Sequence, residues 1–451
     1  MLSARRQGGE LLLVSGVSEI IGSVFTDAFV KRDCSLHIRG NLKGNLTIEQ
    51  GASVIVQGSV DGKVVNRGGR LVVHNKGIAE FVKADGPPEA EAGGILKINL
   101  SSLAANWAAL AKRTTAECAA VVKADAYGCG IATVAAVLAV SGCKTFFVSN
   151  LAEAKRVRAA AQTATIYVLG GLLAGTAPVY ADINVRPVIN SLVELSAWDV
   201  FVDASGWTGG CALNVDTGTS RFGISAQEGA PIAARVRSST HGIALLMSSF
   251  DNTEKPDQAV DRQIKLFQDL RRLFVGIPAS LANSSGIFIG AKTHCDLVRP
   301  GAALYGINPT PGAPNPMQAA IELRGRIMQV RKVAAGETIG HDAGWTAKRP
   351  ARLALVAVGY ADGYPRAGGA DGKMQAIVGG KPCPVAGNPA MDWLAVDITH
   401  LPDTAAARPG DMVTLIGGDI GIDDLAAAAR ITGREVLSRL GRRFHRLYYV
   451  D

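Results

Sequence analysis

Apolar strands and alanine-rich helices alternate along the middle of this chain, and this alternation limits the possible folds more than any other feature. The sequence predicts a strand at 119–122 and a helix at 131–140, followed by a strand at 145–149 and a helix at 151–160. Further strands are expected at 165–169, 185–189, 212–215, 242–247 and 279–281. Such alternation, sustained over about 230 residues, is typical of a parallel (β/α)8 barrel. We place that barrel at residues 95–325.

The pattern changes in the last part of the chain, where strands dominate. Apolar stretches with strand character occupy 323–331, 352–358, 375–378, 393–397 and 412–416. Helical periodicity does not separate them. The sequence therefore predicts a mostly-β C-terminal domain over residues 326–451.

The amino-terminal segment has a different sequence pattern from both the barrel and the C-terminal domain. Between residues 34 and 82, apolar pairs such as Leu36/Ile38 and Leu46/Ile48 recur between closely spaced glycines. Short strands with frequent turns favour a small parallel β-helix or β-solenoid. The segment resembles the polymer-forming domain of bactofilins, and a small β-sandwich-like appendage is the alternative. We expect a domain at 1–84 with possible self-association through its uncapped ends, and a linker at 85–94.

Composition excludes several classes of function. With 451 residues, of which 48% are hydrophobic and 19% charged, the chain suits two or three soluble globular domains. The net charge of +8 comes without the interleaved basic and aromatic stripe of a nucleic-acid-binding protein. Seven cysteines occur singly, so neither a disulfide framework nor a zinc or other metal site is indicated. The cysteines favour a reducing, cytoplasmic location.

No targeting or membrane segment is expected. The apolar run at 11–14 is too short for a signal peptide, and Glu19 prevents its extension. No stretch is long enough to span a membrane.

Lys123 is the residue that points most directly to chemistry. Small apolar residues at 119–122 lead into it, and a glycine-containing loop with Tyr127 comes next. A lysine that only reaches from a strand end to water is the structural alternative. A buried ammonium costs several kcal/mol unless it is paired or neutralised. A Schiff base with an aldehyde cofactor removes this cost and leaves the lysine able to carry a proton.

The run from Ala119 to Gly130 resembles the cofactor-lysine motif of alanine racemases, which bind pyridoxal 5'-phosphate. Other motifs of that family appear in order over residues 95–451. They include Asp216-Thr217-Gly218-Thr219-Ser220-Arg221, Val298-Arg299-Pro300-Gly301, Gly359-Tyr360-Ala361-Asp362-Gly363 and Met391-Asp392. The resemblance implies a barrel followed by a β domain, and a pyridoxal-phosphate-dependent racemase that interconverts L- and D-alanine.

The resemblance also assigns two catalytic bases. Racemisation removes the α-proton from one face of the amino acid and returns one to the other, so it needs two bases. Lys123 matches one of them. Tyr360 matches the other, which in the family reaches in from the partner subunit, so that a homodimer shares its active sites. A strand-end tyrosine with its hydroxyl in water is the structural alternative for Tyr360.

The remaining site residues are likewise implied by matching positions. Arg299 corresponds to the arginine that faces the pyridine nitrogen, and Arg221 to one that binds the cofactor phenolate and the substrate carboxylate. Met391 matches a residue whose backbone N–H meets that carboxylate. The expected cofactor-binding residues are Lys123, Tyr127, Arg221, Ser284, Arg299, Gly301, Ala302 and Arg434.

Four positions depart from the family pattern. Ser249 stands in place of a stacking histidine, Arg434 in place of a phosphate-binding tyrosine, Asn388 in place of an arginine, and His341 in place of a tyrosine. Arginine is a strong phosphate ligand, so Arg434 could preserve that contact. The departures leave two alternatives open: an inert racemase-like scaffold, and a racemase of another small amino acid such as serine.

Overall fold

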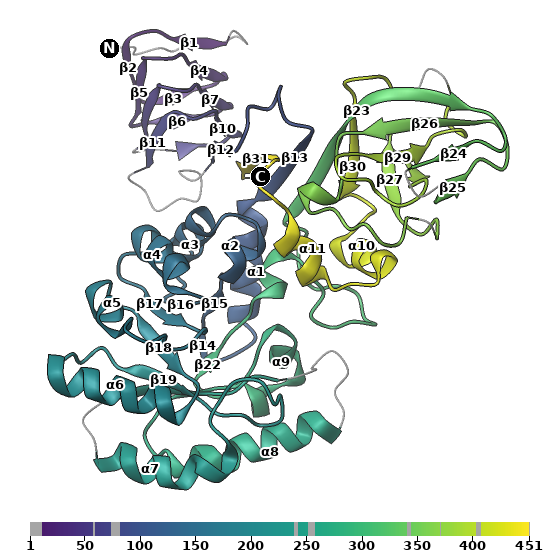
Figure 1. Ribbon diagram of the computed structural model, residues 1–451. Coiled ribbons are helices and arrows are strands. Elements are labelled where there is room, and N and C mark those ends of the chain that lie inside the picture. Colours follow the sequence, from purple (N-terminus) through teal and green to yellow (C-terminus); the bar gives the residue numbers. More distant parts are fainter. Residues whose placement is uncertain are drawn as a thin grey trace. The chain divides into compact units, whose positions relative to one another are not determined.

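The chain divides into two compact units, Met1–Ser102 with Ala319–Asp451, and Leu103–Gln318 (Figure 1). The computed structural model describes residues 11–56, 59–73, 82–238, 242–250, 258–340, 344–369, 371–402 and 407–450. None of the helices in these ranges is long and apolar enough to cross a membrane.

The first unit begins with short parallel strands that form three sheets. Their orders are β1-β4-β7-β10, β2-β5-β8-β11 and β3-β6-β9. In the middle of each sheet, residues that pair on neighbouring strands are 18 positions apart in sequence. Ala28 pairs with Leu46, and Leu46 pairs with Val64. Strand pairing begins at Leu12, whereas the pattern of apolar pairs between glycines is clear in the sequence only from residue 34. The strands are β1 (Leu12–Val14), β2 (Val17–Ile20), β3 (Ser23–Val24), β4 (Ala28–Val30), β5 (Ser35–Ile38), β6 (Asn41–Leu42), β7 (Leu46–Ile48), β8 (Ser53–Val56), β9 (Ser59–Val60), β10 (Val64–Asn66) and β11 (Arg70–Val73).

Alternation along these strands fills one apolar core. Leu36, Ile38, Leu46 and Ile48 are at most 2% exposed and belong to the same cluster of buried side chains. Side chains between them point outward, because successive residues of a strand face opposite sides. Polar side chains hold the turns: Asp27 Oδ1 accepts a hydrogen bond from Asn45 N at 2.7 Å, one repeat further on.

The rest of the first unit is a mostly-β body, which confirms the prediction for the end of the chain. Its sheet order is β12-β31-β13-β23-β30-β27-β28, with β26 joining β23 to β29. The strands are β12 (Ala84–Asp85), β13 (Gly94–Asn99), β23 (Ile321–Val333), β24 (Thr338–Ile339), β25 (Trp345–Thr346), β26 (Ala351–Val356), β27 (Gln375–Val378), β28 (Lys381–Pro384), β29 (Leu394–Asp397), β30 (Met412–Ile416) and β31 (His445–Tyr449). The helices are η5 (Tyr360–Asp362), α10 (Ile422–Ala429) and α11 (Gly433–Arg439).

The second unit is a (β/α)8-like barrel, as the alternation predicts. Strands β15 to β21 pair in parallel and in chain order. Hydrogen bonds from Ala119 N to Val298 O and from Asp296 N to Ala279 O connect β22 to both ends of that series. The strands are β14 (Glu117–Cys118), β15 (Ala120–Val121), β16 (Thr145–Val148), β17 (Thr165–Val168), β18 (Arg186–Ile189), β19 (Cys211–Asn214), β20 (Ile243–Met247), β21 (Ala279–Ser280) and β22 (Leu297–Val298).

Helices lie around these strands, and α3 and α4 have the bounds that the sequence predicts (Figure 1). Inside, Phe147, Tyr167 and Met247 belong to one buried apolar cluster. The helices are α1 (Leu100–Ala111), α2 (Lys123–Tyr127), α3 (Ile131–Val140), α4 (Leu151–Ala160), α5 (Ala177–Asp182), α6 (Leu192–Ser205), η2 (Ala226–Glu228), α7 (Gly229–Ser238), α8 (Gln258–Leu273), α9 (Ser284–Ile289), η3 (Ala291–Thr293) and η4 (Ala302–Tyr305).

Candidate functional site

Lys123 lies just past β15, at the carboxyl ends of the barrel strands, where barrel enzymes carry their active sites. The four residues after it, 124–127, have φ between 54° and 55° and form a left-handed turn. Each L-residue in this conformation costs about 1–2 kcal/mol. Strain of this kind persists only where surrounding contacts enforce it.

Contacts of Asp125 hold the turn in place. Its backbone N–H donates to Glu153 Oε1 at 3.2 Å, and its carboxylate accepts from Ile131 N at 3.0 Å. The same carboxylate forms an ion pair with Arg156 at 2.7 Å. Because Glu153 and Arg156 lie on α4, this helix fixes the backbone that comes after Lys123.

Three of the expected cofactor residues meet beside this turn. Tyr127 is 8% exposed. A Cβ atom added to Gly301 would lie 2.5 Å from Tyr127 Oη, so only glycine allows this approach. Ser284 Oγ accepts hydrogen bonds from Gly301 N at 3.0 Å and Ala303 N at 3.2 Å. Hydroxyl groups and backbone N–H groups are suitable donors to a phosphate dianion. Ala302, also expected here, begins η4 between these two donors.

Arg299 is a buried cation, 5% exposed, directly after β22. It donates hydrogen bonds to Ser280 O at 3.1 Å and to Ser248 O. Its guanidinium carbon lies 5.7 Å from the centre of the Phe147 ring. Burial lowers the pKa of Arg299 to about 10, so the group is still protonated at neutral pH. The site therefore offers a permanent donor and no acceptor at this point.

Arg221 is exposed on the loop after β19. Asp216 organises this loop, because its Oδ1 accepts hydrogen bonds from Gly218 N and Thr219 N, both at 2.9 Å. Although burial alone would raise the pKa of Asp216, these backbone donors hold it below its usual value. Thr217 Oγ1 lies 2.8 Å from Ser248 Oγ, which connects the loop to the residue that accepts from Arg299.

Tyr360 and Met391 lie on adjacent loops of the other unit. Tyr360 N donates to Ala390 O at 3.0 Å and Ala361 N to Met391 O at 2.9 Å. Both side chains are exposed, Tyr360 by 41% and Met391 by 54%. The structure thus brings together two residues that are 31 positions apart and that the sequence predicts for one site.

Sequence reasoning assigned no role to the charged residues beside this pair. Arg443 forms ion pairs with Asp362 at 3.3 Å and with Asp392 at 2.9 Å. Burial raises the pKa of the Asp362 carboxyl, while Gly359 N and Arg443 oppose that shift. The signal was available, since Asp362 and Asp392 each lie within two residues of a predicted site residue.

The departures from the family pattern are found in both units. Arg434 is exposed in the first turn of α11, and Asn388 is exposed before Met391. Ser249 is partly buried after β20, and its carbonyl oxygen accepts a hydrogen bond from Gln263 at 3.5 Å. His341 lies outside the described residues.

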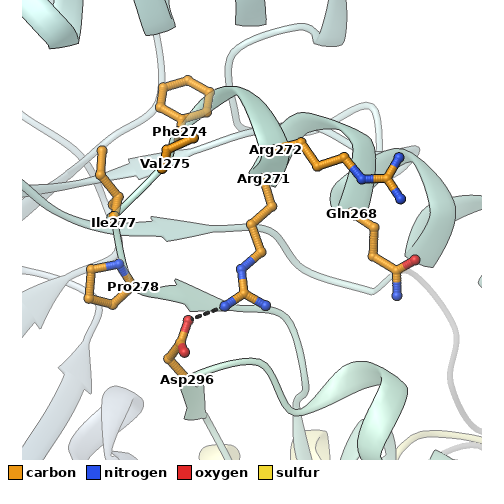
Figure 2. A pocket seen from close by; sticks show the side chains of 9 residues that line it. Gln268, Arg271, Arg272, Phe274, Val275, Ile277, Pro278 and Asp296 are labelled. Carbon is orange, nitrogen blue, oxygen red and sulfur yellow. Dashed lines mark hydrogen bonds and ion pairs between the residues drawn. The ribbon is translucent and has the colours of Figure 1, made fainter.

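A separate hollow of about 670 Å³ lies at the amino ends of β21 and β22, away from the residues above (Figure 2). Its lining includes Phe274, Val275 and an ion pair of Arg271 with Asp296 at 2.7 Å. It contains none of the predicted site residues. In the described ranges, no group of three or more His, Cys, Asp or Glu side chains is placed to hold a metal ion.

Comparison with known proteins assigns two successive parts of the chain to the same family. The family model described as "Alanine racemase, N-terminal domain" matches residues 98–309, and "Alanine racemase, C-terminal domain" matches residues 320–448. An alanine racemase of Methylobacterium sp. (strain 4-46) is 47% identical over 358 residues, which are 79% of this chain and 98% of the relative. One of Acidiphilium cryptum (strain JF-5) is 42% identical over 356 residues, 78% of this chain and 98% of the relative.

Solved structures agree. The alanine racemase from Bartonella henselae with covalently bound pyridoxal phosphate has a TM-score of 0.74 and 31% identity, and the match covers 79% of this chain and 99% of that one. The biosynthetic alanine racemase from Pseudomonas aeruginosa has a TM-score of 0.73 and 32% identity, with the same coverage. With two family models and several relatives matching almost their whole length, the chain belongs to the alanine racemase family.

Proposed function

We propose that this protein is a pyridoxal-phosphate-dependent alanine racemase that acts as a homodimer. The observation that carries the proposal is the convergence of Tyr127, Ser284 and Gly301 beside the strained turn after Lys123. Relatives that are 47% and 42% identical are named alanine racemase, which supports alanine as the substrate.

The residues of the barrel fit the cofactor. Lys123 would hold the cofactor aldehyde, as the covalently bound cofactor of the Bartonella henselae relative suggests. The hydroxyls of Ser284 and Tyr127 and the backbone at Gly301 and Ala302 would bind its phosphate, with Arg434 as a further phosphate ligand. When bound, pyridoxal phosphate spreads the negative charge of a deprotonated α-carbon over its ring.

The protein's own groups then handle the proton. Lys123 Nζ would remove or return the α-proton on one face, and Tyr360 Oη of the partner subunit would do so on the other. Arg299 donates and cannot accept a hydrogen bond, so it favours an unprotonated ring nitrogen. Arg221 and the backbone N–H of Met391 of the partner subunit, which lies beside the partner's Tyr360, would bind the substrate carboxylate and fix the α-carbon between the two bases.

Activity measurements test this proposal directly. Purified protein should racemise L- and D-alanine, and Lys123→Ala and Tyr360→Phe should each lower kcat by a factor of about 10³ or more, since each removes one of two bases. Rescue of a D-alanine auxotroph by the wild type and not by Tyr360→Phe would exclude a purely structural role. Faster turnover of serine or lysine than of alanine would overturn the substrate assignment.

We propose further that the amino-terminal segment is a bactofilin-like β-solenoid that mediates self-association. The 18-residue spacing of its parallel partners supports this. Exposed apolar side chains gather in its first strands and turns, including Val17 at 89% and Phe25 at 66% exposure. Light scattering of the full chain tests it: particles no larger than a dimer would contradict further association.

The cytoplasm is the proposed location. The seven cysteines all lie in the described part of the chain and none is in a disulfide bond, and five of them are buried. Cysteines without disulfide bonds suit a reducing compartment. Recovery of the protein with the periplasmic or extracellular fraction would contradict this location.

A further inference from the structure

We infer that Arg443 is a positioning residue, which fixes Tyr360 relative to the Met391 backbone by joining the two loops that carry them. This inference rests on the proposed function, since it concerns the placement of a proposed base. Arg443 Nε lies 3.3 Å from Asp362 Oδ1, and its Nη2 lies 2.9 Å from Asp392 Oδ1. One guanidinium thus bridges two loops 30 residues apart in sequence.

Asp362 transmits this contact to Tyr360 through a short turn. Tyr360 begins the 3-10 turn η5 and Asp362 ends it. The Asp362 carboxylate also accepts a hydrogen bond from Gly359 N at 2.8 Å, so it is tied to both sides of Tyr360. Its side chain is only 7% exposed, and a displacement of this carboxylate would therefore move the turn.

The second loop is in backbone contact with the first. A Cβ atom added to Gly359 would lie 2.3 Å from Met391 O, which leaves no space between the loops. Asp392 comes directly after Met391, whose N–H is proposed to bind the substrate carboxylate. The distance between that N–H and the Tyr360 hydroxyl therefore depends on the contact between these two loops, which the Arg443 side chain bridges.

A third segment supports the arrangement. Gly441 N donates to Asp362 O at 2.8 Å, two residues before Arg443. Gly363 comes after η5 with φ of +93°, and a Cβ atom there would lie 1.8 Å from Arg439 O. The segment 439–443 thus contacts the Tyr360 turn through its backbone as well as through the Arg443 side chain.

Arginine suits this position because its planar fork presents donors in two directions. Without it, the carboxylates of Asp362 and Asp392 would repel each other, since burial and, to a smaller extent, the nearby Asp392 charge raise the pKa of the Asp362 carboxyl. A lysine supplies one point charge and cannot donate to both carboxylates with the same geometry. The two aspartates would then separate and Tyr360 would move.

Isotope effects on racemisation test the inference. Arg443→Gln should lower kcat by about tenfold, because small displacements of a reacting group have effects of this size or larger. With α-deuterated alanine, the primary isotope effect should rise in the direction in which Tyr360 removes the α-proton and fall in the other. Arg443→Lys and Asp392→Asn should shift both values in the same sense by smaller amounts.

The control is Arg430→Gln, which breaks an exposed ion pair of the same unit, Arg430 with Asp371 at 2.7 Å. It should leave kcat and both isotope effects unchanged. If Arg443→Gln lowers kcat with both isotope effects unchanged, or matches Arg430→Gln, the positioning role is wrong. If the wild type does not racemise, or Tyr360→Phe is fully active, the proposed function itself fails.

Discussion

The ring of Tyr127 stacks on that of Tyr305, with centroids 4.6 Å apart and an angle of 27° between the planes. Tyr305 is fully buried, and its hydroxyl lies 3.4 Å from Val121 O at the end of β15. The strained turn after Lys123 thus ends at Tyr127, and the buried ring of Tyr305 holds the Tyr127 side chain in position. This stack holds the Tyr127 hydroxyl close to Gly301.

Gly301→Ala is expected to weaken cofactor binding. The added methyl group would lie 2.5 Å from Tyr127 Oη and must displace that side chain. Overpacking of this kind costs about 1–3 kcal/mol, so the dissociation constant of pyridoxal phosphate should rise by about 5-fold to 150-fold. Titration of the apoprotein with the cofactor measures this. Gly344→Ala, at a position with open space, should bind normally, and equal affinity of the two variants would contradict the prediction.

Thr217→Val and Ser248→Ala should each loosen the Arg221 loop. Both side chains are buried and their hydroxyl oxygens are 2.8 Å apart, so removing one leaves the other without this partner. Each change should cost about 1–2 kcal/mol, and the double variant should cost less than the sum. Hydrogen exchange of the amides at 216–220 and 246–248 measures the local opening free energy. Strict additivity would show that the two hydroxyls do not interact.

The stabilisation by Asp216 should depend on pH. Its folded pKa is lowered below the usual 3.8 by the backbone donors of its loop, despite some burial. The ionised carboxylate therefore contributes stability above pH 3.8, and this contribution is lost as the pH falls through the lower, folded value. Asp216→Ala should lower the free energy of unfolding by about 1 kcal/mol at neutral pH. A difference from wild type that grows on acidification would contradict this sign.

Ile38→Ala should open the amino-terminal segment without affecting racemisation. Ile38 is fully buried in the apolar core of the short strands. Loss of such a side chain costs about 2–5 kcal/mol, so proteolytic cleavage within residues 35–56 should become faster. Gln50→Ala, at an exposed polar position of the same segment, should leave the cleavage rate unchanged. Equal protease resistance of both variants would show that this core is not needed.

Local patterns in the sequence predicted much of this fold. The helices at 131–140 and 151–160 and the strands at 375–378 and 412–416 have the bounds expected from apolar periodicity. Each of them has a continuous apolar or alanine-rich pattern that begins and ends clearly. The barrel was predicted from the alternation of strands and helices over the middle of the chain, from 119–122 to 279–281, because parallel strands require a crossover between them.

Other features depend on partners that a local pattern does not contain. The left-handed turn at 124–127 has no glycine, and contacts of Asp125 with α4 stabilise it. Strand β13 has a clear apolar pattern, yet nothing near it in sequence indicates that it pairs with β23 and β31. The bridge formed by Arg443 likewise joins segments that only the folded chain brings together.

The 18-residue spacing of the amino-terminal strands restricts how this segment can change in length. Removing a whole repeat, for example from Leu46 to the residue before Val64, would keep every remaining inward side chain facing inward and every ladder bond between equivalent atoms. Removing nine residues would instead bring a strand of one sheet under a strand of another. Natural variants should therefore gain or lose this region in steps of one full repeat.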